Sequence, residues 1–473
     1  MERYDAVIVG SGPNGLAAAI TLADAGRSVL VVERAEEIGG GARTMELTLP
    51  GFHHDLCSTV HATAILSPYL RSLPLDGHGL EWAVPEVPLA HAFAPGRSVP
   101  LPRDLDEAVD SLGADGAAYR DVMGPLVRNW PKLEDAILGP IPRIPTHPIT
   151  LARFARNALL PATTAARRFE MEETRALFAG CAAHAFLPLS SPLTASFGWF
   201  LMATAHLGGW PVARGGSGAL AAAMASYARS RGVEFQTSTE ITTLDELPPR
   251  GLTLLDISPN QFARMAGKDL PAGYLRKATG FVRGPGVYKL DIATSGAIPW
   301  LDPELRRAGT VHLDGTLAEI NLAESEAFRG MHPERPFILV VQATRFDPTR
   351  APAGQETVWA YAHVPNGSGR DLTDHILGRI SEHAPGFRET VLAVHATDPA
   401  GFESHNPNYL GGDISGGAHT FRQLVFRPFP QRDPYATPLP GVFLCSASTP
   451  PGAGTHGMCG HLAARSALAW TAN

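Results

Sequence analysis

The sequence predicts an α/β protein of two intertwined domains: a discontinuous domain built on a parallel sheet, and a second domain that combines a mixed sheet with helices. Three glycine-rich turns predict it. One follows a strand at the start of the chain, a second begins at residue 208, and a third follows an apolar strand at residues 441–445; each leads into a helix. The 473 residues exceed one ordinary domain, and a hydrophobic content of 44% is sufficient for a buried core.

The first turn lies in a strand–turn–helix–strand pattern with the spacing of a dinucleotide-binding unit. Residues 5–9 (DAVIV) form an apolar strand, residues 16–25 a helix, and residues 28–32 a second strand that ends at Glu33. The turn between them consists of Gly10, Ser11, Gly12, Pro13, Asn14 and Gly15. The glycines allow a tight turn, close approach to a diphosphate and close packing of helix on strand, while Glu33 can bind a ribose diol. The pattern therefore predicts a Rossmann-like domain that binds a dinucleotide.

A further glycine segment, Gly39-Gly40-Gly41-Ala42-Arg43-Thr44, follows shortly after Glu33. With the first motif, it resembles the flavin amine oxidase superfamily, in which a GGxxxT/S segment completes the FAD site, and more closely the phytoene-desaturase-like branch. The resemblance implies FAD as the cofactor, with Ser58 to His61 approaching the isoalloxazine ring. In this part of the chain it implies an FAD site made by Glu33, Arg34, Gly40, Gly41, Ala42, Arg43, Thr44, Ser58 and Thr59. The alternative for Arg43 is an ordinary surface arginine.

The overall composition argues against several classes of function. A net charge of −7 gives no global attraction to nucleic acid, so we expect no nucleic-acid partner. The four cysteines are widely separated and form no CxxC pair, which argues against a disulfide-reductase site and against a metal site. The first strand starts by residue 5, and no apolar run is long enough to span a membrane. We therefore expect a cytoplasmic protein.

The middle of the chain contains the predicted second domain. Prolines punctuate residues 62–97, which we interpret as a loop-rich crossover. Helical patterns at residues 170–183 and 195–207 predict the floor of a substrate chamber. Strand-like segments alternating with helices predict a mixed sheet covered on one side by helices; the clearest strands are residues 287–292, 337–342 and 357–363.

The predicted helix at residues 151–160 combines leucines with Arg153 and Arg156. Two interpretations are open. The segment could be an interfacial patch through which a lipophilic substrate arrives from a membrane, or an ordinary helix with solvated arginines and leucines that face the core. A peripheral membrane contact therefore remains an open prediction.

The second glycine-rich turn, at residues 208–218, leads into a helix and a strand but is not a second Rossmann motif. A reductase with a dedicated NAD(P)H domain is therefore disfavoured. The resemblance implies that this part returns to the flavin domain, with the backbone near Glu240 to Thr242, including Ile241, beside the adenine. The β-meander expected next is cut short by the strand at residues 252–256.

The third turn follows the strand at residues 441–445 and opens a helix of small residues. The resemblance is close here, and closest to the group labelled as pyridine nucleotide-disulphide oxidoreductase domain proteins, although the cysteines fit that label poorly. It implies a helix N-terminus that stabilises charge on the reduced flavin, with Gly457 and Met458 as donors. The FAD-binding residues implied in this segment are Ser446, Gly454, His456, Gly457 and Met458.

His456 and His61 are the candidate catalytic residues, since a histidine beside the flavin can shuttle a proton. A purely structural role is the alternative for both. The polar loop at residues 405–413 either borders the flavin and the substrate or is a simple turn. No pair of an acid and a base is visible, so positioning of the substrate against the ring is expected to do most of the catalysis.

These observations predict an FAD domain at residues 1–70, 205–262 and 430–473, and a substrate domain at residues 71–204 and 263–429. By resemblance, the enzyme would dehydrogenate or desaturate a lipophilic or natural-product-like small molecule, with hydride passing to flavin N5 and oxygen or another acceptor reoxidising the flavin. The alternatives are a flavin-dependent C=C isomerase or saturase, an amine oxidase, and a non-catalytic flavin-containing binding protein. Neither the substrate nor the oligomeric state leaves a clear trace in the sequence.

Overall fold

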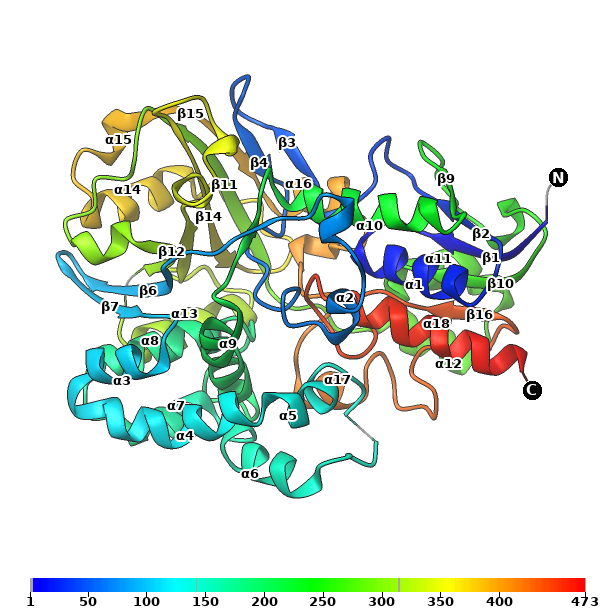
Figure 1. Ribbon diagram of the computed structural model, residues 1–473, viewed down its shortest axis with the longest axis horizontal. Coiled ribbons are helices and arrows are strands. Elements are labelled where there is room, and N and C mark those ends of the chain that lie inside the picture. The colour runs from blue at the N-terminus through cyan, green and yellow to red at the C-terminus, as the bar shows by residue number, and fades with distance from the viewer. Residues whose placement is uncertain (1–2, 142, 314, 473) are drawn as a thin grey trace.

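A five-stranded parallel sheet forms one half of the protein (Figure 1). The computed structural model describes residues 3–141, 143–313 and 315–472. In the sheet order β16-β10-β1-β2-β9, the strands are β16 (Val442–Leu444), β10 (Arg250–Leu255), β1 (Tyr4–Val9), β2 (Val29–Val32) and β9 (Glu234–Gln236). The start, middle and end of the chain thus meet in one sheet. No β-meander lies between β9 and β10, as the sequence predicts.

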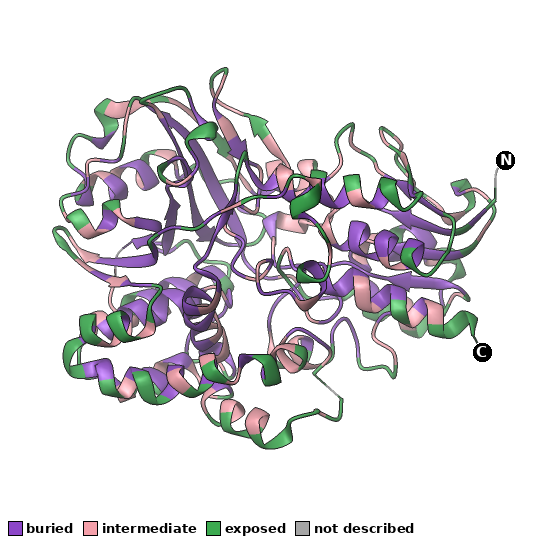
Figure 2. Ribbon diagram, viewed as in Figure 1, coloured by how far each residue is buried: buried purple, intermediate pink, exposed green. Residues whose placement is uncertain are grey.

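Both faces of this sheet are covered, which explains why its central strands are almost entirely apolar. On one face, Ala6 and Ile8 pack in a core with α1 (Pro13–Asp24), α10 (Ser217–Ser230) and α18 (Met458–Thr471). On the opposite face, Val7 and Val9 pack against α11 (Pro259–Ala266). The alternation of side chains along β1 therefore serves two helical layers. Figure 2 shows the buried strands between helices whose outer sides are exposed.

A seven-stranded mixed sheet forms the second half of the molecule (Figure 1). In the sheet order it contains β15 (Val391–Thr397), β11 (Gly286–Thr294), β14 (Glu356–Val364), β13 (Ile338–Val341), β12 (Ala308–Leu313), β6 (Val87–Ala94) and β7 (Arg97–Leu101). All neighbouring pairs are antiparallel except β12 and β6. One face packs on α14 (Thr373–His383) and α15 (Phe387–Thr390), which confirms the predicted mixed sheet with a helical cover.

The prediction of a loop-rich crossover at residues 62–97 is wrong in part, because this stretch supplies β6 to the mixed sheet. Pro88 lies inside β6, and a proline within an apolar run argues against a strand. The proline is tolerated because the pairing of β6 with β7 begins at Leu89, where an N–H is available again. Two short hairpin-like pairs also form, β3 (Thr44–Glu46) with β4 (His53–Asp55) and β5 (Trp82–Ala83) with β8 (Val212–Ala213).

A helical layer lies beneath the mixed sheet in the view of Figure 1. It comprises α3 (Leu105–Ser111), α4 (Gly116–Arg128), α5 (Trp130–Ile137), α6 (Pro148–Ala158), α7 (Ala162–Ala165), α8 (Glu172–Ala183) and α9 (Thr194–Gly208), with α13 (Leu317–Phe328) against α8. The remaining helices are α2 (Pro68–Arg71), α12 (Ala272–Thr279), α16 (Pro399–His405) and α17 (Phe421–Val425). Helices α8 and α9 are buried, whereas α6 lies at the edge of the molecule (Figure 2).

The structure agrees with the interpretation of the cysteines. All four are buried and free. Among the described residues, no group of three or more His, Cys, Asp or Glu side chains could hold a metal ion. Within the same ranges, no helix combines the length and the apolar character needed to cross a bilayer.

Candidate functional site

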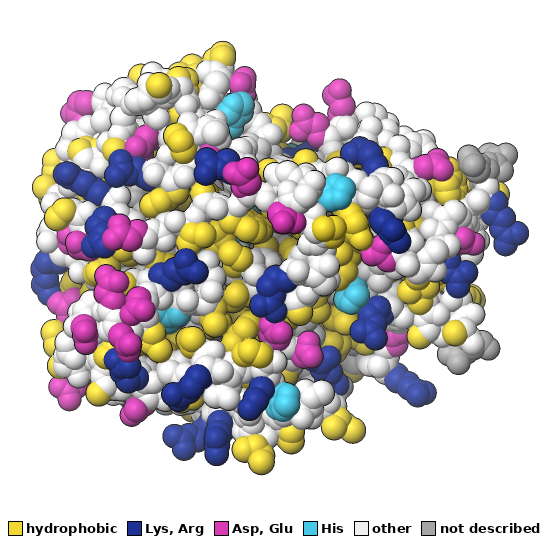
Figure 3. Space-filling model, viewed as in Figure 1, with side chains coloured by type: hydrophobic (Ala, Val, Ile, Leu, Met, Phe, Trp, Pro, Cys, Tyr) yellow, Lys and Arg dark blue, Asp and Glu magenta, His cyan; other side chains and the backbone are white. Residues whose placement is uncertain are grey.

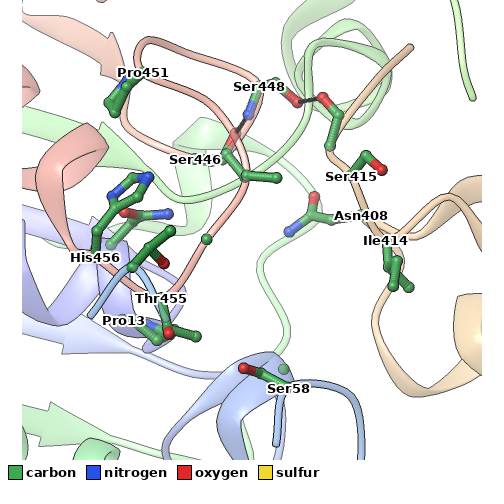
Figure 4. A pocket seen from close by; sticks show the side chains of 18 of the residues that line it. Pro13, Ser58, Asn408, Ile414, Ser415, Ser446, Ser448, Pro451, Thr455 and His456 are labelled. Carbon is green, nitrogen blue, oxygen red and sulfur yellow. Dashed lines mark hydrogen bonds between the residues drawn. The ribbon is translucent and has the colours of Figure 1, made fainter. Parts of the chain in front are cut away.

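One large cavity of about 1040 Å³ runs from the parallel sheet to the mixed sheet. Figure 4 shows a part of its wall in which Pro13, Ser58, Asn408, Ser446 and His456 come together from distant parts of the chain. We call the part beside β1, β2 and β10 the nucleotide end. We call the part formed by the mixed sheet and by helices α5, α6 and α9 the substrate chamber.

The nucleotide end contains the predicted turn at the N-terminus of α1. Its lining includes Gly10, Ser11, Gly12, Pro13 and Asn14. The last glycine of the turn, Gly15, lies behind the wall, where a Cβ would stand 2.1 Å from the carbonyl oxygen of Gly10. Glycine is therefore required at that position for the close packing of turn and helix.

The donors at this turn fit a bound diphosphate. Among the described residues, the amides of Gly12 and Asn14 donate to no acceptor, and the buried Oδ1 of Asn14 has no partner. Such free amides at a helix N-terminus bind phosphate oxygens. The residues present therefore fit FAD.

Glu33 stands at the end of β2 with its carboxylate held in place. Its Oε2 accepts hydrogen bonds from the amide and the hydroxyl of Ser11, at 2.8 and 2.7 Å, and its Oε1 accepts from the amide of Ala35 at 2.9 Å. Glu33 and Arg34 line the cavity. An oriented carboxylate at this place suits a ribose diol.

The second glycine segment lies across the cavity from the first. Gly40, Gly41, Ala42 and Arg43 line the wall. A Cβ on Gly40 would lie 3.0 Å from the Cα of Gly12, so the two turns approach closely. Arg43 is half-buried and bonds to the carbonyl of Gly40 at 3.0 Å and to Nε2 of His405 at 2.8 Å. It is therefore part of the wall and not an ordinary surface arginine.

Thr44 does not reach the cavity. Its hydroxyl donates to Asp55 Oδ1 at 2.6 Å and accepts from the amide of Gly218 at 2.9 Å. Asp55 is fully buried and also accepts from Thr59 and Arg350. The network joins the glycine segment to the residue 216 turn and to the mixed-sheet half, which is a structural role.

The loop at residues 405–413 borders the cavity. His405, Asn406, Pro407, Asn408 and Tyr409 all belong to the lining. The Tyr409 hydroxyl stands where a Cβ on Gly41 would be, only 2.0 Å away, so glycine at position 41 makes room for the ring. The far side of the nucleotide end is formed by Glu240, Ile241 and Thr242, in the place expected for the adenine.

Asp256 is a prominent residue that the sequence analysis missed. It follows β10, lines the cavity and accepts the amide hydrogen of Gly15 at 3.0 Å on Oδ2. A Cβ on Gly12 would lie 2.8 Å from the same oxygen. Burial, with a smaller contribution from the charge of Glu33, raises the pKa of Asp256 to about 7, against the effect of the Gly15 amide. An acidic residue after an apolar strand was the only signal in the sequence.

The C-terminal loop contributes Ser446, Gly454 and His456 to the wall. Gly457 and Met458 lie behind it: the amide of Met458 donates to Nδ1 of His456 at 3.1 Å, and a Cβ on Gly457 would stand 3.1 Å from Ala17. The predicted donor Met458 is thus already engaged by the His456 ring, because the loop folds back over the start of α18. Burial lowers the pKa of His456 to about 4, so its imidazole is neutral near pH 7.

His61 lies behind the cavity wall. It is fully buried, and its two ring nitrogens pair with the hydroxyls of Thr455 and Ser217, both at 2.9 Å. Ser58 and Thr59, by contrast, line the cavity. In this structure His61 connects the C-terminal loop to the start of α10, and it does not face a substrate.

The substrate chamber is apolar and uncharged over most of its surface. Helix α9 contributes to its floor, as expected, whereas α8 does not line it. Its aliphatic and aromatic lining includes Phe154, Phe186, Phe197, Phe200, Leu201, Trp210, Leu339, Val341, Trp359 and Tyr361. The aspartate and glutamate residues that line the whole cavity are Glu33, Glu240 and Asp256, and all three belong to the nucleotide end.

The ionisable side chains deep in the chamber are neutral near pH 7. Burial lowers the pKa of His184 and of His419 to about 3 and raises that of Tyr361. His184 Nε2 lies 3.3 Å from Nε2 of the buried His312, and His419 pairs with the carbonyl of Ala185. The chamber therefore offers hydrogen-bonding groups without charge.

A cavity that passes from a dinucleotide-binding turn into an apolar chamber is the arrangement of an FAD-dependent oxidoreductase. A family model described as flavin containing amine oxidoreductase matches residues 14–266, more than half of the chain, and the chain therefore belongs to this family. FAD is accordingly the cofactor of the protein. The family assignment confirms the resemblance seen in the sequence and the α/β fold expected from it.

Named relatives cover the chain to different extents. The chain is 27% identical to the mouse (Mus musculus) pyridine nucleotide-disulfide oxidoreductase domain-containing protein 2, over 98% of this chain and 93% of that protein. It is 35% identical to a limonene dehydrogenase polypeptide of Castellaniella defragrans over 24% of this chain and 20% of that polypeptide.

Solved structures share the fold at low identity. An oxidoreductase from Methanosarcina mazei has a TM-score of 0.66 and 14% identity, with 99% of this chain and 100% of that chain covered. Cyclohexylamine oxidase from Brevibacterium oxydans has a TM-score of 0.62 and 16% identity, with 99% of each chain covered. At these identities the likeness establishes the fold alone.

Proposed function

We propose that the protein dehydrogenates or desaturates a neutral, lipophilic small molecule bound in the substrate chamber. The observation that carries the proposal is the chamber itself, which is lined by apolar and aromatic side chains and by no carboxylate. Bound FAD supplies the hydride acceptor. Oxygen or another electron acceptor then reoxidises the cofactor.

The lining disfavours a charged substrate on energetic grounds. A protonated amine that leaves water must be paired with an anion, because an unpaired buried charge costs several kcal/mol. The carboxylates of the cavity are confined to the nucleotide end, and His184, His419 and Tyr361 are neutral near pH 7. A neutral hydrocarbon skeleton meets no such penalty. The relative named as a limonene dehydrogenase agrees with a substrate of this kind.

The chain's own residues position the substrate and exclude water. Leu339, Val341 and Trp359 form a rigid wall on the mixed sheet, and Phe197 and Phe200 face the chamber from α9. His184 offers a neutral imidazole at this wall, held by His312. Holding a carbon–hydrogen bond against the cofactor in a dry chamber supplies most of the catalytic effect in this scheme.

Amine oxidation is the second candidate, because the family is named for it. Trp210, Trp359, Tyr361 and Tyr409 all line the cavity, which places aromatic rings in the chamber. Trp359 and Tyr361 pack edge to face, with an interplanar angle of 87°. They therefore do not form a parallel pair between which an amine would be held.

Anaerobic titration of the purified protein tests the proposal. The preparation should be yellow and should bleach on addition of dithionite; a colourless protein that FAD cannot reconstitute would overturn it. Limonene and cyclohexylamine form a suitable pair of probes, one a neutral cyclic hydrocarbon and the other a cyclic amine. We expect neutral cyclic hydrocarbons to bleach the flavin and cyclohexylamine to leave it oxidised, whereas bleaching by the amine alone would establish amine oxidation.

The product mass separates the remaining alternatives. Desaturation removes two hydrogens from the substrate, whereas a C=C isomerase that requires reduced FAD leaves the mass unchanged and a saturase adds two hydrogens. A protein that binds flavin without any turnover would show none of these products. The predicted domain division, at residues 1–70, 205–262 and 430–473 against 71–204 and 263–429, is kept as part of the proposal, apart from residues 1–2, 142, 314 and 473, which lie outside the described residues.

A further inference from the structure

The segment between α5 and α8 differs in charge from the rest of the chain. Residues 136–169, which we call the basic segment, contain five arginines and no aspartate or glutamate, in a protein whose net charge is −7. Arg143, Arg153, Arg156 and Arg167 are exposed. Arg153 and Arg156 form no ion pair with any carboxylate that the structure describes. Their positive charge is therefore free to meet an external anion.

The same segment exposes large apolar side chains. Ile144 is 96% exposed and Ile149 is 70% exposed, the highest values among the large apolar residues described, and Ile141 and Leu159 are 50% and 55% exposed. At the lower edge of Figure 3, where α6 lies in Figure 1, hydrophobic and dark-blue basic side chains stand next to one another. An exposed apolar cluster beside unpaired arginines is typical of a surface that inserts into an anionic bilayer interface.

Helix α6 has two faces with different uses. Leu151, Phe154, Ala155 and Ala158 follow helical spacing and line the substrate chamber. Ile149, Arg153 and Arg156 follow the same spacing on the outer face. The helix is thus a single layer between the chamber and the exterior.

The chamber reaches the exterior beside this helix. Ile141, Arg143 and Leu159 line the cavity and are exposed at the same time. A molecule that leaves a bilayer at this edge would meet apolar side chains from the surface to the chamber. Because a lipophilic molecule partitions into lipid and not into water, a mouth placed at the bilayer gives the chamber direct access to its substrate.

We propose that the basic segment docks the protein on an anionic lipid bilayer, with Ile144 and Ile149 inserted among the headgroups and Arg143, Arg153 and Arg156 bound to lipid phosphates. The contact is peripheral, and the mouth of the substrate chamber faces the membrane. The inference rests on the proposed function only for the nature of the molecule that passes through the mouth. The docking itself follows from the charge and exposure of the segment.

Vesicle co-sedimentation of the full-length holoenzyme tests the docking without any substrate. The two membranes are vesicles of phosphatidylcholine and vesicles of three parts phosphatidylcholine to one part phosphatidylglycerol, each at low and high salt. We expect binding to the anionic vesicles at low salt, with at least a tenfold loss of binding at 0.5 M salt because exposed charges are screened. Absence of binding to both kinds of vesicle would overturn the proposal.

Two variants locate the surface, each with a matched control. Arg153→Gln with Arg156→Gln removes two exposed charges, and Arg276→Gln with Lys277→Gln removes two exposed charges from α12. Ile144→Ser with Ile149→Ser removes the apolar contact, and Val282→Ser with Leu322→Ser alters exposed apolar residues elsewhere. The first member of each pair should weaken binding to anionic vesicles about tenfold or more, and the controls should leave it unchanged. Equal effects in variants and controls would show that another surface binds.

Size measurement in solution separates a lipid surface from a second copy of the chain. Should Ile144→Ser with Ile149→Ser convert an oligomer to a monomer while neither protein binds vesicles, the patch is a protein interface and the proposal is wrong. The outcome is independent of the proposed reaction, since vesicle binding is measured without turnover. Turnover of a polar substrate would overturn the proposed function and leave the vesicle result to stand alone.

Discussion

Asp256 controls the charge balance at the nucleotide end. It lies beside the turn that would receive the diphosphate, and its carboxyl accepts the amide hydrogen of Gly15. Burial raises its pKa to about 7 from an ordinary value near 3.8. A negative diphosphate brought to Gly12 disfavours the ionised carboxylate further, so FAD and a proton on Asp256 should bind cooperatively.

Asp256→Asn should change the pH dependence of stability and of FAD binding. A group whose pKa is raised on folding contributes stability that is complete below its unfolded value, about 4, and is lost as the pH rises through about 7. The wild type should therefore lose stability between pH 4 and pH 7 relative to the variant, by up to about 4 kcal/mol. Unfolding temperatures of both proteins, measured across this range, give the difference.

FAD titrations from pH 6 to pH 9 provide the second measurement. We expect the wild-type affinity to fall above pH 7 and the affinity of Asp256→Asn to stay flat, because asparagine keeps an acceptor for Gly15 but carries no charge. Parallel pH profiles for the two proteins would show that Asp256 does not titrate in this range.

His61→Ala should reduce stability without changing catalysis by the bound flavin. The substitution leaves the buried hydroxyl of Ser217 without its histidine partner, at a cost of about 1–3 kcal/mol. We expect a lower unfolding temperature and a lower flavin content, with an unchanged rate per bound flavin. A loss of 100-fold or more in that normalised rate would instead indicate a general acid or base, which typically contributes 10²–10⁴-fold.

At the scale of elements, the contact between α1 and α18 sets the shape of the nucleotide end. A Cβ on Gly460 would stand 1.7 Å from the backbone oxygen of Asn14, so the first turns of the two helices meet with no space between them. Each helix begins at the cavity, one after the Gly10–Gly15 turn and the other after His456. Their separation therefore fixes the distance between two walls of the site.

Gly460→Ala should force α18 away from α1, because the clash is with backbone and not with a flexible side chain. Overpacking of this kind costs about 1–3 kcal/mol, and the flavin affinity should fall with it. Gly273→Ala in α12 is the matched control, since a Cβ there meets nothing within 4 Å and alanine favours a helix by about 1 kcal/mol. Equal stability of the two variants would contradict the tight packing.

The same contacts show which features the sequence could predict. The turn from Gly10 to Glu33 is a local pattern whose strand, helix and acid lie within 24 positions, so spacing alone identifies it. The bond between Gly15 and Asp256 spans 241 positions, and no local rule connects an acid after one strand to a turn after another. For β6, Pro88 obscured a strand that is held by β12, far along the chain.

The site residues divide for the same reason. Ser11, Glu33 and Arg43 could be proposed because a motif specifies their place in a nucleotide site. Thr44 and Met458 were proposed by the same logic, but their polar groups are taken by Asp55 and His456 in the folded chain. The substrate chamber carries no motif, since apolar residues that line a cavity have the same sequence pattern as apolar residues that fill a core.

On the scale of the whole molecule, the cavity joins parts of the chain that are distant in sequence. Gly12, Ile241 and His456 lie on its wall and come from the beginning, middle and end of the chain. An extended cofactor that touches all three connects them in the folded state only. Its binding should therefore stabilise the molecule as a unit, by about 2.7 kcal/mol when free FAD is 100-fold above its dissociation constant.

The length of the cofactor, and not the flavin ring alone, should produce this stabilisation. FMN carries the ring and one phosphate but no adenosine, so it cannot reach Glu33 and Ile241 while its ring lies beside His456. We expect FAD to raise the unfolding temperature of the apoprotein and to protect residues 10–15, 239–242 and 446–456 from hydrogen exchange together, whereas FMN at the same concentration protects the last of these alone. Equal protection by both flavins would mean that the adenine half makes no contact and that the first glycine turn serves another ligand.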